Sequence, residues 1–238
     1  MEKIRKIYEG KAKILYETQD PDLLIQYFKD DATAFNAQKR GTIVNKGIYN
    51  NRISSWLFRL LEGYGVSTHF VDMLSERDML VKRLEILPVE VVVRNIIAGS
   101  LAIRFGVEEG MELKIPILEF YYKNDALGDP MINEDHIRAL GIASSEEIEQ
   151  VRAVAFRVND ILLKFFDDRR ILLVDFKLEF GRHKSASGGL LVGDEITPDG
   201  CRLWDKDTLE KMDKDRFRRD MDRIEEAYQE VCRRVCGT

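Results

Sequence analysis

Apolar and polar positions alternate over short stretches in the first half of the chain, which is typical of half-buried β-strands. The alternation predicts two strands over 4–8 and 12–16, joined by a turn at Glu9-Gly10-Lys11. Further strands are predicted over 24–29, 68–71, 79–84, 89–94 and 118–123. Pro88 interrupts two of these apolar stretches, so we expect a boundary between two lobes near residues 84–88.

Apolar residues at helical spacing predict a second kind of element. Positions from Ile53 to Tyr64 recur at i, i+3 and i+4 and predict a helix over 45–64. Ser144 and Glu147 form an expected capping box at the start of a long helix. Other helices are predicted over 100–105, 134–140 and 215–234. The chain is therefore expected to mix helices and strands, and it contains no internal repeat.

The stretch 171–181 combines an apolar strand with a row of charges. Asp175, Lys177 and Glu179 alternate with apolar residues, so in a strand they share one face at a spacing of about 6.6 Å. Such a row suits a site that holds metal ions together with a phosphorylated substrate. A half-exposed strand with cross-strand ion pairs would explain the same pattern.

Composition narrows the class of protein. The chain has 238 residues, of which 45% are hydrophobic, and its net charge of −5 argues against a general nucleic-acid binder. No apolar run approaches the roughly 20 residues that span a bilayer, and the N-terminus has no apolar signal segment. Three cysteines without a framework spacing favour a reducing, cytoplasmic compartment, and the three scattered histidines do not suggest zinc.

Three further clusters carry candidate chemistry. The turn with Gly10, Lys11 and Lys13 could bring backbone amides and ammonium groups to a polyphosphate, or it could be only a turn. Arg94 could fork onto a carboxylate or phosphate beside Gly99-Ser100, or it could pair with Glu90. A third loop carries mixed charges that could equally be solvent-exposed: Asp194, Glu195, Arg202 and Asp205.

Taken together, these motifs closely resemble the phosphoribosylaminoimidazole-succinocarboxamide synthase (SAICAR synthetase) family. The matching segments are 8–13, 33–36, Lys46-Gly47 with Asn50-Asn51, 87–100, 174–181 and 193–205, with a weaker match at Lys214-Asp215 and Arg218. The resemblance spans essentially the whole chain. It implies a two-lobed α+β fold with an ATP-grasp or kinase-like nucleotide cleft. A small nucleotide-binding lobe of antiparallel sheet would cover 1–84, and a larger substrate and metal lobe 85–238.

The resemblance also implies the reaction. The family uses ATP to join L-aspartate to carboxyaminoimidazole ribonucleotide (CAIR), giving SAICAR, ADP and phosphate in de novo purine synthesis. The CAIR carboxylate would attack the γ-phosphate to give an acyl phosphate, which the aspartate amine then displaces. Phosphoryl transfer depends on alignment and charge neutralisation, so Mg²⁺ is the implied cofactor.

Family roles carry over to positions of this chain that match the motifs. The implied ATP contacts are Lys11, Ala12, Lys13, Ile86 and Lys123. The implied metal ligands are Glu179, Asp194 and Asp175. The implied CAIR contacts are Arg94, Ser100, Lys177, Arg202 and Arg218, and the central catalytic roles fall to Lys177, Asp175 and Arg94.

Several points stay open from the sequence. Some family members carry Asp where this chain has Asn36, so we do not count Asn36 as a metal ligand. The serines and glycines between Arg182 and Leu190 suit a lid that orders on substrate binding. A homodimer is what the family suggests, but the aspartate pocket and the base for its amine are not identified. A related ligase or kinase, a regulatory nucleotide-binding module and an RNA-binding protein are less economical alternatives.

Overall fold

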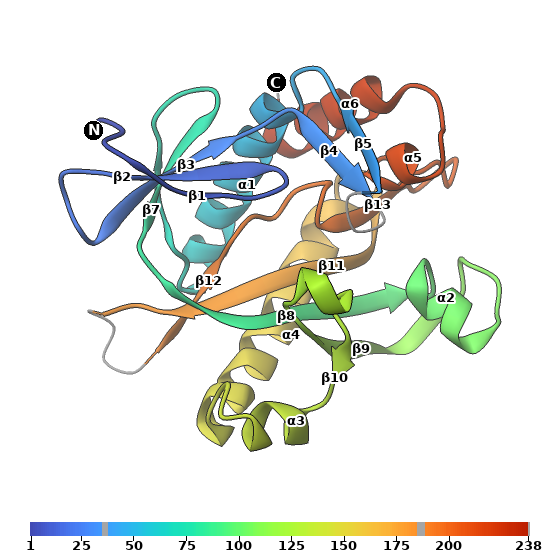
Figure 1. Ribbon diagram of the computed structural model, residues 1–238. Helices are drawn as coiled ribbons and strands as arrows, with labels where there is room; N and C mark the ends of the chain where they lie inside the picture. The colour runs from blue at the N-terminus through green and yellow to red at the C-terminus, as the bar shows by residue number, and fades with distance from the viewer. Residues whose placement is uncertain (35–37, 185–188, 238) are drawn as a thin grey trace.

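Two antiparallel sheets form the framework of the molecule (Figure 1). The computed structural model describes residues 1–34, 38–184 and 189–237. The first sheet has the order β1-β2-β3-β7-β6. Its strands are β1 (Lys6–Glu9), β2 (Lys13–Glu17), β3 (Leu23–Phe28), β6 (Phe70–Met73) and β7 (Asp78–Lys82). The turn between β1 and β2 therefore carries Gly10 and Lys11 at the end of a hairpin, as the alternation predicts.

The second sheet is built around one long strand. The order is β10-β9-β8-β11-β12, and β13 pairs with the first half of β11 while β12 pairs with its end. These strands are β8 (Glu85–Ile96), β9 (Glu112–Tyr122), β10 (Met131–Ile132), β11 (Ile171–Arg182), β12 (Leu190–Gly193) and β13 (Cys201–Asp205). A separate hairpin of β4 (Asp31–Ala34) and β5 (Lys39–Thr42) lies beyond the first sheet.

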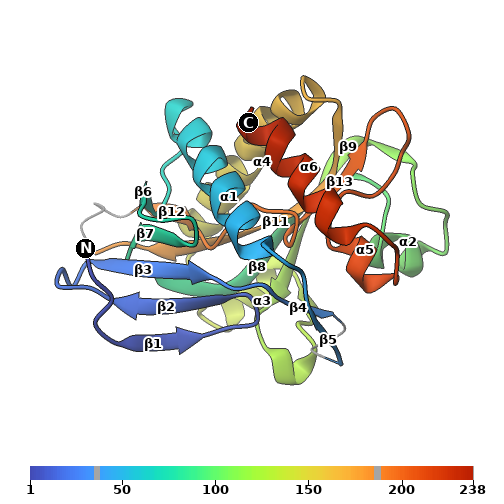
Figure 2. The same cartoon turned by 90° about the horizontal axis from the view of Figure 1, so that it is seen from above.

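Helices pack behind both sheets and join them into one core (Figure 2). They are α1 (Lys46–Gly63), α2 (Ser100–Phe105), α3 (Glu134–Ala139), α4 (Ser145–Asp167), α5 (Asp215–Arg218) and α6 (Ile224–Cys236), with a 3₁₀ turn at Asp125–Leu127. α1 contacts β3, β6 and α6, whereas α4 contacts β8 and β11. Phe28 of the first sheet and Phe176 of the second belong to the same buried cluster. None of the helices in the described ranges combines the length and apolar character of a membrane span.

Most predicted elements are present. The helix over 45–64, the short helix over 100–105 and the capping box at Ser144 are confirmed. Pro88, however, does not interrupt a strand: it lies inside β8, where it is exposed and its carbonyl accepts a hydrogen bond from Lys123 at 3.0 Å. The chain instead passes from the first sheet to the second at residues 83–84, and the division into lobes at residue 84 stays a prediction.

The prediction of a single C-terminal helix over 215–234 is wrong. α5 ends at Arg218 and α6 begins at Ile224, because Asp220 and Arg223 adopt left-handed backbone angles of 53° and 60° in φ. Such residues cannot continue a right-handed helix. The bend lets Phe217 before it and Tyr228 after it pack together with Ala32 of β4 in a small second core.

Replacing Ser144 with alanine should lower the free energy of unfolding by about 1 kcal/mol, the usual contribution of a helix N-cap. The Ser144 hydroxyl accepts from the Glu147 amide at 3.2 Å, and the Glu147 carboxylate accepts from the Ser144 amide at 2.9 Å. Urea denaturation measures the change, with Ser145→Ala at the next, exposed position as the control. Equal midpoints for the two variants would show that the cap contributes nothing to α4.

Candidate active site

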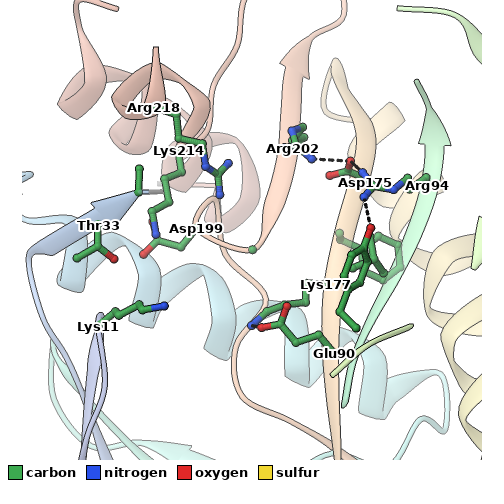
Figure 3. A pocket seen from close by; sticks show the side chains of 15 residues that line it. Lys11, Thr33, Glu90, Arg94, Asp175, Lys177, Asp199, Arg202, Lys214 and Arg218 are labelled. Carbon is green, nitrogen blue, oxygen red and sulfur yellow. Dashed lines mark hydrogen bonds and ion pairs between the residues drawn. The ribbon is translucent and has the colours of Figure 1, made fainter. Parts of the chain in front are cut away.

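A cleft between the two sheets holds two adjoining cavities. The larger has a volume of about 1210 Å³ and the smaller about 360 Å³. Lysines and carboxylates line the boundary, since both cavities share Lys11, Thr33, Glu90, Lys177, Asp199, Gly200 and Lys214. Figure 3 shows the smaller cavity, with Lys11 and Asp199 on one wall and Lys177 and Arg94 on the other.

The larger cavity is apolar at one end and charged at the other. Leu15, Leu24, Val81, Leu84 and Ile86 line it together with the charged residues at its far end. Two glycines let the chain after β7 lie close to the second sheet. A Cβ on Gly181 would lie 2.8 Å from Leu84 Cβ, and one on Gly193 would lie 3.3 Å from Ile86 Cδ1. This end can receive a flat apolar ring.

The charged end is a cluster of carboxylates held by lysines. Lys177 Nζ lies 2.9 Å from both Glu90 and Glu179 and 3.6 Å from Asp194. Lys123 Nζ lies 2.5 Å from Glu179. Lys13 pairs with Asp194 and lies 3.0 Å from Glu195. The cluster therefore gathers residues from β2, β8, β11, the position directly after β9 and the loop after β12.

Burial and charge act in opposite directions on the pKa values in this cluster. Burial by itself raises the pKa of Asp194, but the Lys13 and Lys177 ammonium groups lower it well below its usual range. Burial likewise lowers the pKa of Lys177, but Glu179, Asp194 and Glu90 raise it above its ordinary value. Both partners consequently stay ionised at neutral pH.

The charged row on β11 faces the cleft as its alternation predicts. Strand pairing places Asp175 opposite Arg94 of β8, and it places Glu179 opposite Gly193 at the end of β12. Phe176, Leu178 and Phe180 on the other face are buried in the core. One strand thus presents an anion, a cation and an anion to the cleft while its second face anchors the sheet.

Arginines dominate the smaller cavity. Arg94 donates to Glu119 at 2.6 Å, to Asp175 at 2.8 Å and to the Ser100 hydroxyl at 3.0 Å. Arg202 donates to the same Asp175 oxygen at 2.8 Å (Figure 3). Asp175 is therefore held between two guanidinium groups and is not among the carboxylates around Lys177.

A second carboxylate fixes the arginines on the C-terminal side of this cavity. Arg202 Nε donates to Asp215 at 3.0 Å, and Arg218 donates to the other Asp215 oxygen at 2.5 Å. Gly99 makes room for Arg202, because a Cβ at Gly99 would lie 2.3 Å from a guanidinium nitrogen. The Gly99-Ser100 pair singled out in the sequence thus packs directly against the arginine cluster.

Glu109 holds the backbone at Gly99, and its ionisation should affect stability in acid. It accepts from the Gly99 amide at 2.8 Å and from Lys211 at 3.1 Å. Burial raises its pKa, but Arg219, the Gly99 amide and Lys211 lower it to about 2 from an ordinary 4.5. A depressed native pKa stabilises the fold above about pH 4.5, and this contribution is lost as pH falls toward 2.

The stability difference between the wild type and Glu109→Gln should therefore shrink as pH falls from 4.5 toward 2. Urea denaturation at half-unit pH steps measures it. A constant difference over that window would mean that the Glu109 carboxyl titrates alike in the folded and unfolded chains.

The structure brings the predicted residues into this one cleft. The predicted ATP contacts Lys11, Ala12, Lys13, Ile86 and Lys123 line the larger cavity, as do Glu179 and Asp194. Arg94, Asp175, Lys177, Arg202 and Arg218 line the smaller one, and Ser100 supports Arg94 from beside it. Asp205 lies elsewhere and pairs with Arg234 of α6 at 2.7 Å. Asn36, and Ser185, Ser187 and Gly188 of the proposed lid, lie outside the described residues.

Sequence reasoning gave no role to the buried residues that hold Asp199 at the cleft, although Lys46 lies in a segment that matches the family. Lys46 is fully buried, and its Nζ lies 2.6 Å from Asp199. The Tyr228 hydroxyl donates to the other Asp199 oxygen at 2.6 Å. The available signal was a lysine followed by Asn50, Asn51 and Ser54 on the buried face of α1, where apolar residues are the rule.

An apolar recess that leads to ordered lysines and carboxylates, beside a second cavity walled by arginines, is typical of a nucleotide-dependent enzyme that acts on a second anionic substrate. Comparison with known proteins gives the particular family. The family model for SAICAR synthetase matches residues 6–235. A phosphoribosylaminoimidazole-succinocarboxamide synthase of Magnetococcus marinus is 56% identical over 235 residues, covering 99% of this chain and 97% of the relative. The synthase of the same name from Novosphingobium aromaticivorans is 59% identical, covering 99% of this chain and 90% of the relative.

Solved structures agree with these relatives. The enzyme of the same name from Ehrlichia chaffeensis superposes with a TM-score of 0.95 at 46% identity, covering 97% of this chain and 98% of that one. A SAICAR synthetase in complex with ADP gives a TM-score of 0.93 at 47% identity, covering 97% of each chain. The chain belongs to the SAICAR synthetase family. It is an ATP-dependent ligase with SAICAR synthase activity in de novo purine biosynthesis, which confirms the predicted fold, reaction and enzyme class.

Proposed function

We propose that the larger cavity binds ATP, that the smaller one binds CAIR, and that the two substrates meet at Lys177. One observation carries this assignment: Lys177 lines both cavities and lies beside Glu179 and Asp194 of the larger one, where a transferred phosphoryl group would have to lie. A carboxylate from one side and a γ-phosphate from the other could be aligned there without a covalent catalyst.

On the ATP side, the apolar end with Ile86 suits an adenine ring. Lys11 and Lys13 lie at the β1–β2 turn and beyond it, where they suit the phosphates. Lys11 now contacts Asp125 at 2.7 Å, and Lys123 contacts Glu179, so both ammonium groups would exchange a carboxylate for a phosphate oxygen. A relative in complex with ADP supports a nucleotide in this fold.

Glu179 and Asp194 fit a magnesium ion better than Asp175 does. Both lie within reach of Lys177 Nζ, and carboxylate oxygens are what Mg²⁺ prefers. Within the ranges that the structure describes, no cluster of three His, Cys, Asp or Glu side chains is arranged for a metal. Water and phosphate oxygens would complete the coordination, as is usual for Mg²⁺. When bound, the ion neutralises phosphate charge during transfer.

On the CAIR side, the arginines supply fixed positive charge. Arg94 donates its N–H groups to four neighbours: Glu119, Asp175, Ser100 and Tyr121. It would therefore act mainly by holding this wall of the cavity in place. Arg202 and Arg218, anchored by Asp215, are better placed to meet the substrate's anionic groups. Asp175 would then orient Arg94 and Arg202, and its predicted role as a metal ligand stays untested.

The chemistry follows from these positions. The CAIR carboxylate attacks the γ-phosphorus, and the bond to the bridging oxygen breaks as ADP leaves. Lys177 stays charged at the meeting point of the cavities and would hold the attacking carboxylate there. The product is an acyl phosphate, whose carbonyl carbon accepts the amine of L-aspartate with release of phosphate.

Omission of each substrate in turn tests the proposal. ADP release should require Mg²⁺, ATP and CAIR, and hydroxylamine should replace L-aspartate by trapping the acyl phosphate as a hydroxamate. ADP release that ignores CAIR would instead identify a hydrolase, and failure of hydroxylamine to yield hydroxamate would exclude the acyl phosphate.

Homodimer formation and a cytoplasmic location remain parts of the proposal. Exposed apolar side chains on α2 and in and beside β9 support an interface with a second copy: Ile103, Phe105, Met111 and Ile115. Light scattering on the purified protein measures the mass, and Ile103→Glu with Ile115→Glu should convert a dimer to monomers. A monomeric wild type at micromolar concentration would count against the interface.

A further inference from the structure

We propose that Lys214 takes a proton from the ammonium group of L-aspartate and so generates the amine that attacks the acyl phosphate. The assignment rests on the acyl phosphate of the proposed reaction and adds the proton acceptor that it needs. Lys214 lines both cavities and immediately precedes α5, next to the substrate arginines.

Lys214 differs from every other lysine of the cleft because its side chain makes no hydrogen bond or ion pair with any of the described residues. Each of the others contacts a carboxylate or a carbonyl oxygen: Lys11, Lys13, Lys29, Lys82, Lys123 and Lys177. Figure 3 shows the Lys214 side chain reaching into the smaller cavity toward Asp199. Its nitrogen is therefore available to a ligand without breaking an ion pair.

The other candidate bases of the smaller cavity are engaged. Asp175 accepts from two arginines, and Glu90 lies 2.9 Å from Lys177. Asp199 accepts from Lys46 and Tyr228, and these partners keep it a fixed anion of low basicity. His69, the described histidine that lines the larger cavity, is buried, and burial lowers its pKa to about 3.

The surroundings of Lys214 lower its pKa, so its neutral form is favoured more than that of an exposed lysine. Burial is the main influence that lowers its pKa, and Arg218 of α5 and Lys46 of α1 act in the same direction. Asp199 and Glu195, from the loop after β12, act in the opposite direction. A base with a pKa nearer to that of the working solution is the more effective proton acceptor.

The proton balance of the step is complete with this residue. The aspartate ammonium gives one proton to neutral Lys214 and becomes an amine. The nitrogen lone pair then forms the C–N bond, and the C–O bond breaks with its electron pair going to phosphate. The second nitrogen proton passes to the departing phosphate, and Lys214 returns its proton to solvent. Asp199, beside Lys214, would stabilise the charge that Lys214 carries in between.

Hydroxylamine separates this role from a structural one, because it is already neutral at pH 7 and needs no base. In Lys214→Met, aspartate-dependent ADP release should fall about 10²-fold or more, the usual effect of losing a general base. Hydroxylamine-dependent release should stay within about threefold of the wild type. Equal losses with both nucleophiles, or no loss with aspartate, would overturn the assignment.

Lys214→Arg distinguishes a proton acceptor from a simple positive charge. Arginine keeps the charge but does not deprotonate in proteins, so this variant should fail with aspartate as Lys214→Met does. Recovery of activity in Lys214→Arg would assign Lys214 to carboxylate binding and overturn its role as a base. The aspartate rate of Lys214→Met should also rise about tenfold per pH unit, since only the free amine reacts.

Lys164→Met, at an exposed position of α4, serves as the matched control and should behave as the wild type in every assay. Wild-type protein that releases no ADP with hydroxylamine would overturn the acyl phosphate and this assignment together. If the Lys214 variants lose activity only with aspartate, the ATP and CAIR sites are intact and the loss lies in the aspartate step.

Discussion

Asp194→Asn is expected to lower kcat for SAICAR formation by about 10²–10³-fold, the usual effect of removing one oriented charge from a phosphoryl-transfer or oxyanion site. Asp194 is buried beside Lys13 and Lys177, and with Glu179 it forms the carboxylate pair that we propose holds magnesium. Asparagine keeps the shape of the side chain but removes the charge. The concentration of Mg²⁺ needed for half-maximal rate should rise in the variant.

The backbone conformation at Asp194 makes asparagine a suitable replacement. Asp194 has a φ of 62°, in the left-handed region that asparagine also tolerates, so the substitution should leave the loop intact. ADP release at several Mg²⁺ concentrations measures the effect, and Asp168→Asn at an exposed position is the control. An unchanged magnesium requirement in Asp194→Asn would place the metal on other residues.

Arg202→Met should reduce kcat/KM for CAIR by about 10²-fold, equivalent to roughly 2–4 kcal/mol of transition-state binding. Arg202 joins Asp175 to Asp215 and occupies the space that Gly99 leaves. Its loss removes a fixed cation from the wall and leaves each carboxylate with one arginine partner fewer. Because ATP would bind in the other cavity, KM for ATP should change little.

Arg202→Lys should recover only part of the loss, since an ammonium group cannot bridge two carboxylates with the fork geometry of a guanidinium. Steady-state rates at varied CAIR and varied ATP give the two constants, and Arg233→Met on the exposed face of α6 is the control. A rise in KM for ATP equal to that for CAIR would indicate collapse of the whole cleft instead. Urea denaturation of each variant checks that possibility.

Local signals in the sequence were sufficient to predict where many of the site's side chains lie. Alternation along 171–181 placed Asp175, Lys177 and Glu179 on one face, and the glycine-lysine turn placed Lys11 at the mouth of a cavity. Both features lie within a few residues of chain, where strand and turn geometry determine which way side chains point.

What the sequence could not show depends on contacts between distant segments. Lys46 and Asp199 are 153 residues apart, and nothing local predicts their ion pair. The bend between α5 and α6 has no glycine or proline to mark it, and it follows from the packing of Phe217 and Tyr228 around the β4–β5 hairpin. The strands β12 and β13 were missed because each is short and is defined mainly by its pairing with β11.

The lysines around Glu90, Glu179, Asp194 and Glu195 have a consequence for how the enzyme chooses its nucleotide. Three ammonium groups, from Lys13, Lys123 and Lys177, face these four carboxylates, so the protein supplies most of its own counterions but remains one positive charge short. Uncomplexed ATP would bring still more negative charge to this surface and be repelled. In the proposed site, the charge of a bound magnesium ion would offset part of this repulsion, so the cleft would favour the metal complex of ATP over the uncomplexed nucleotide before any bond is made.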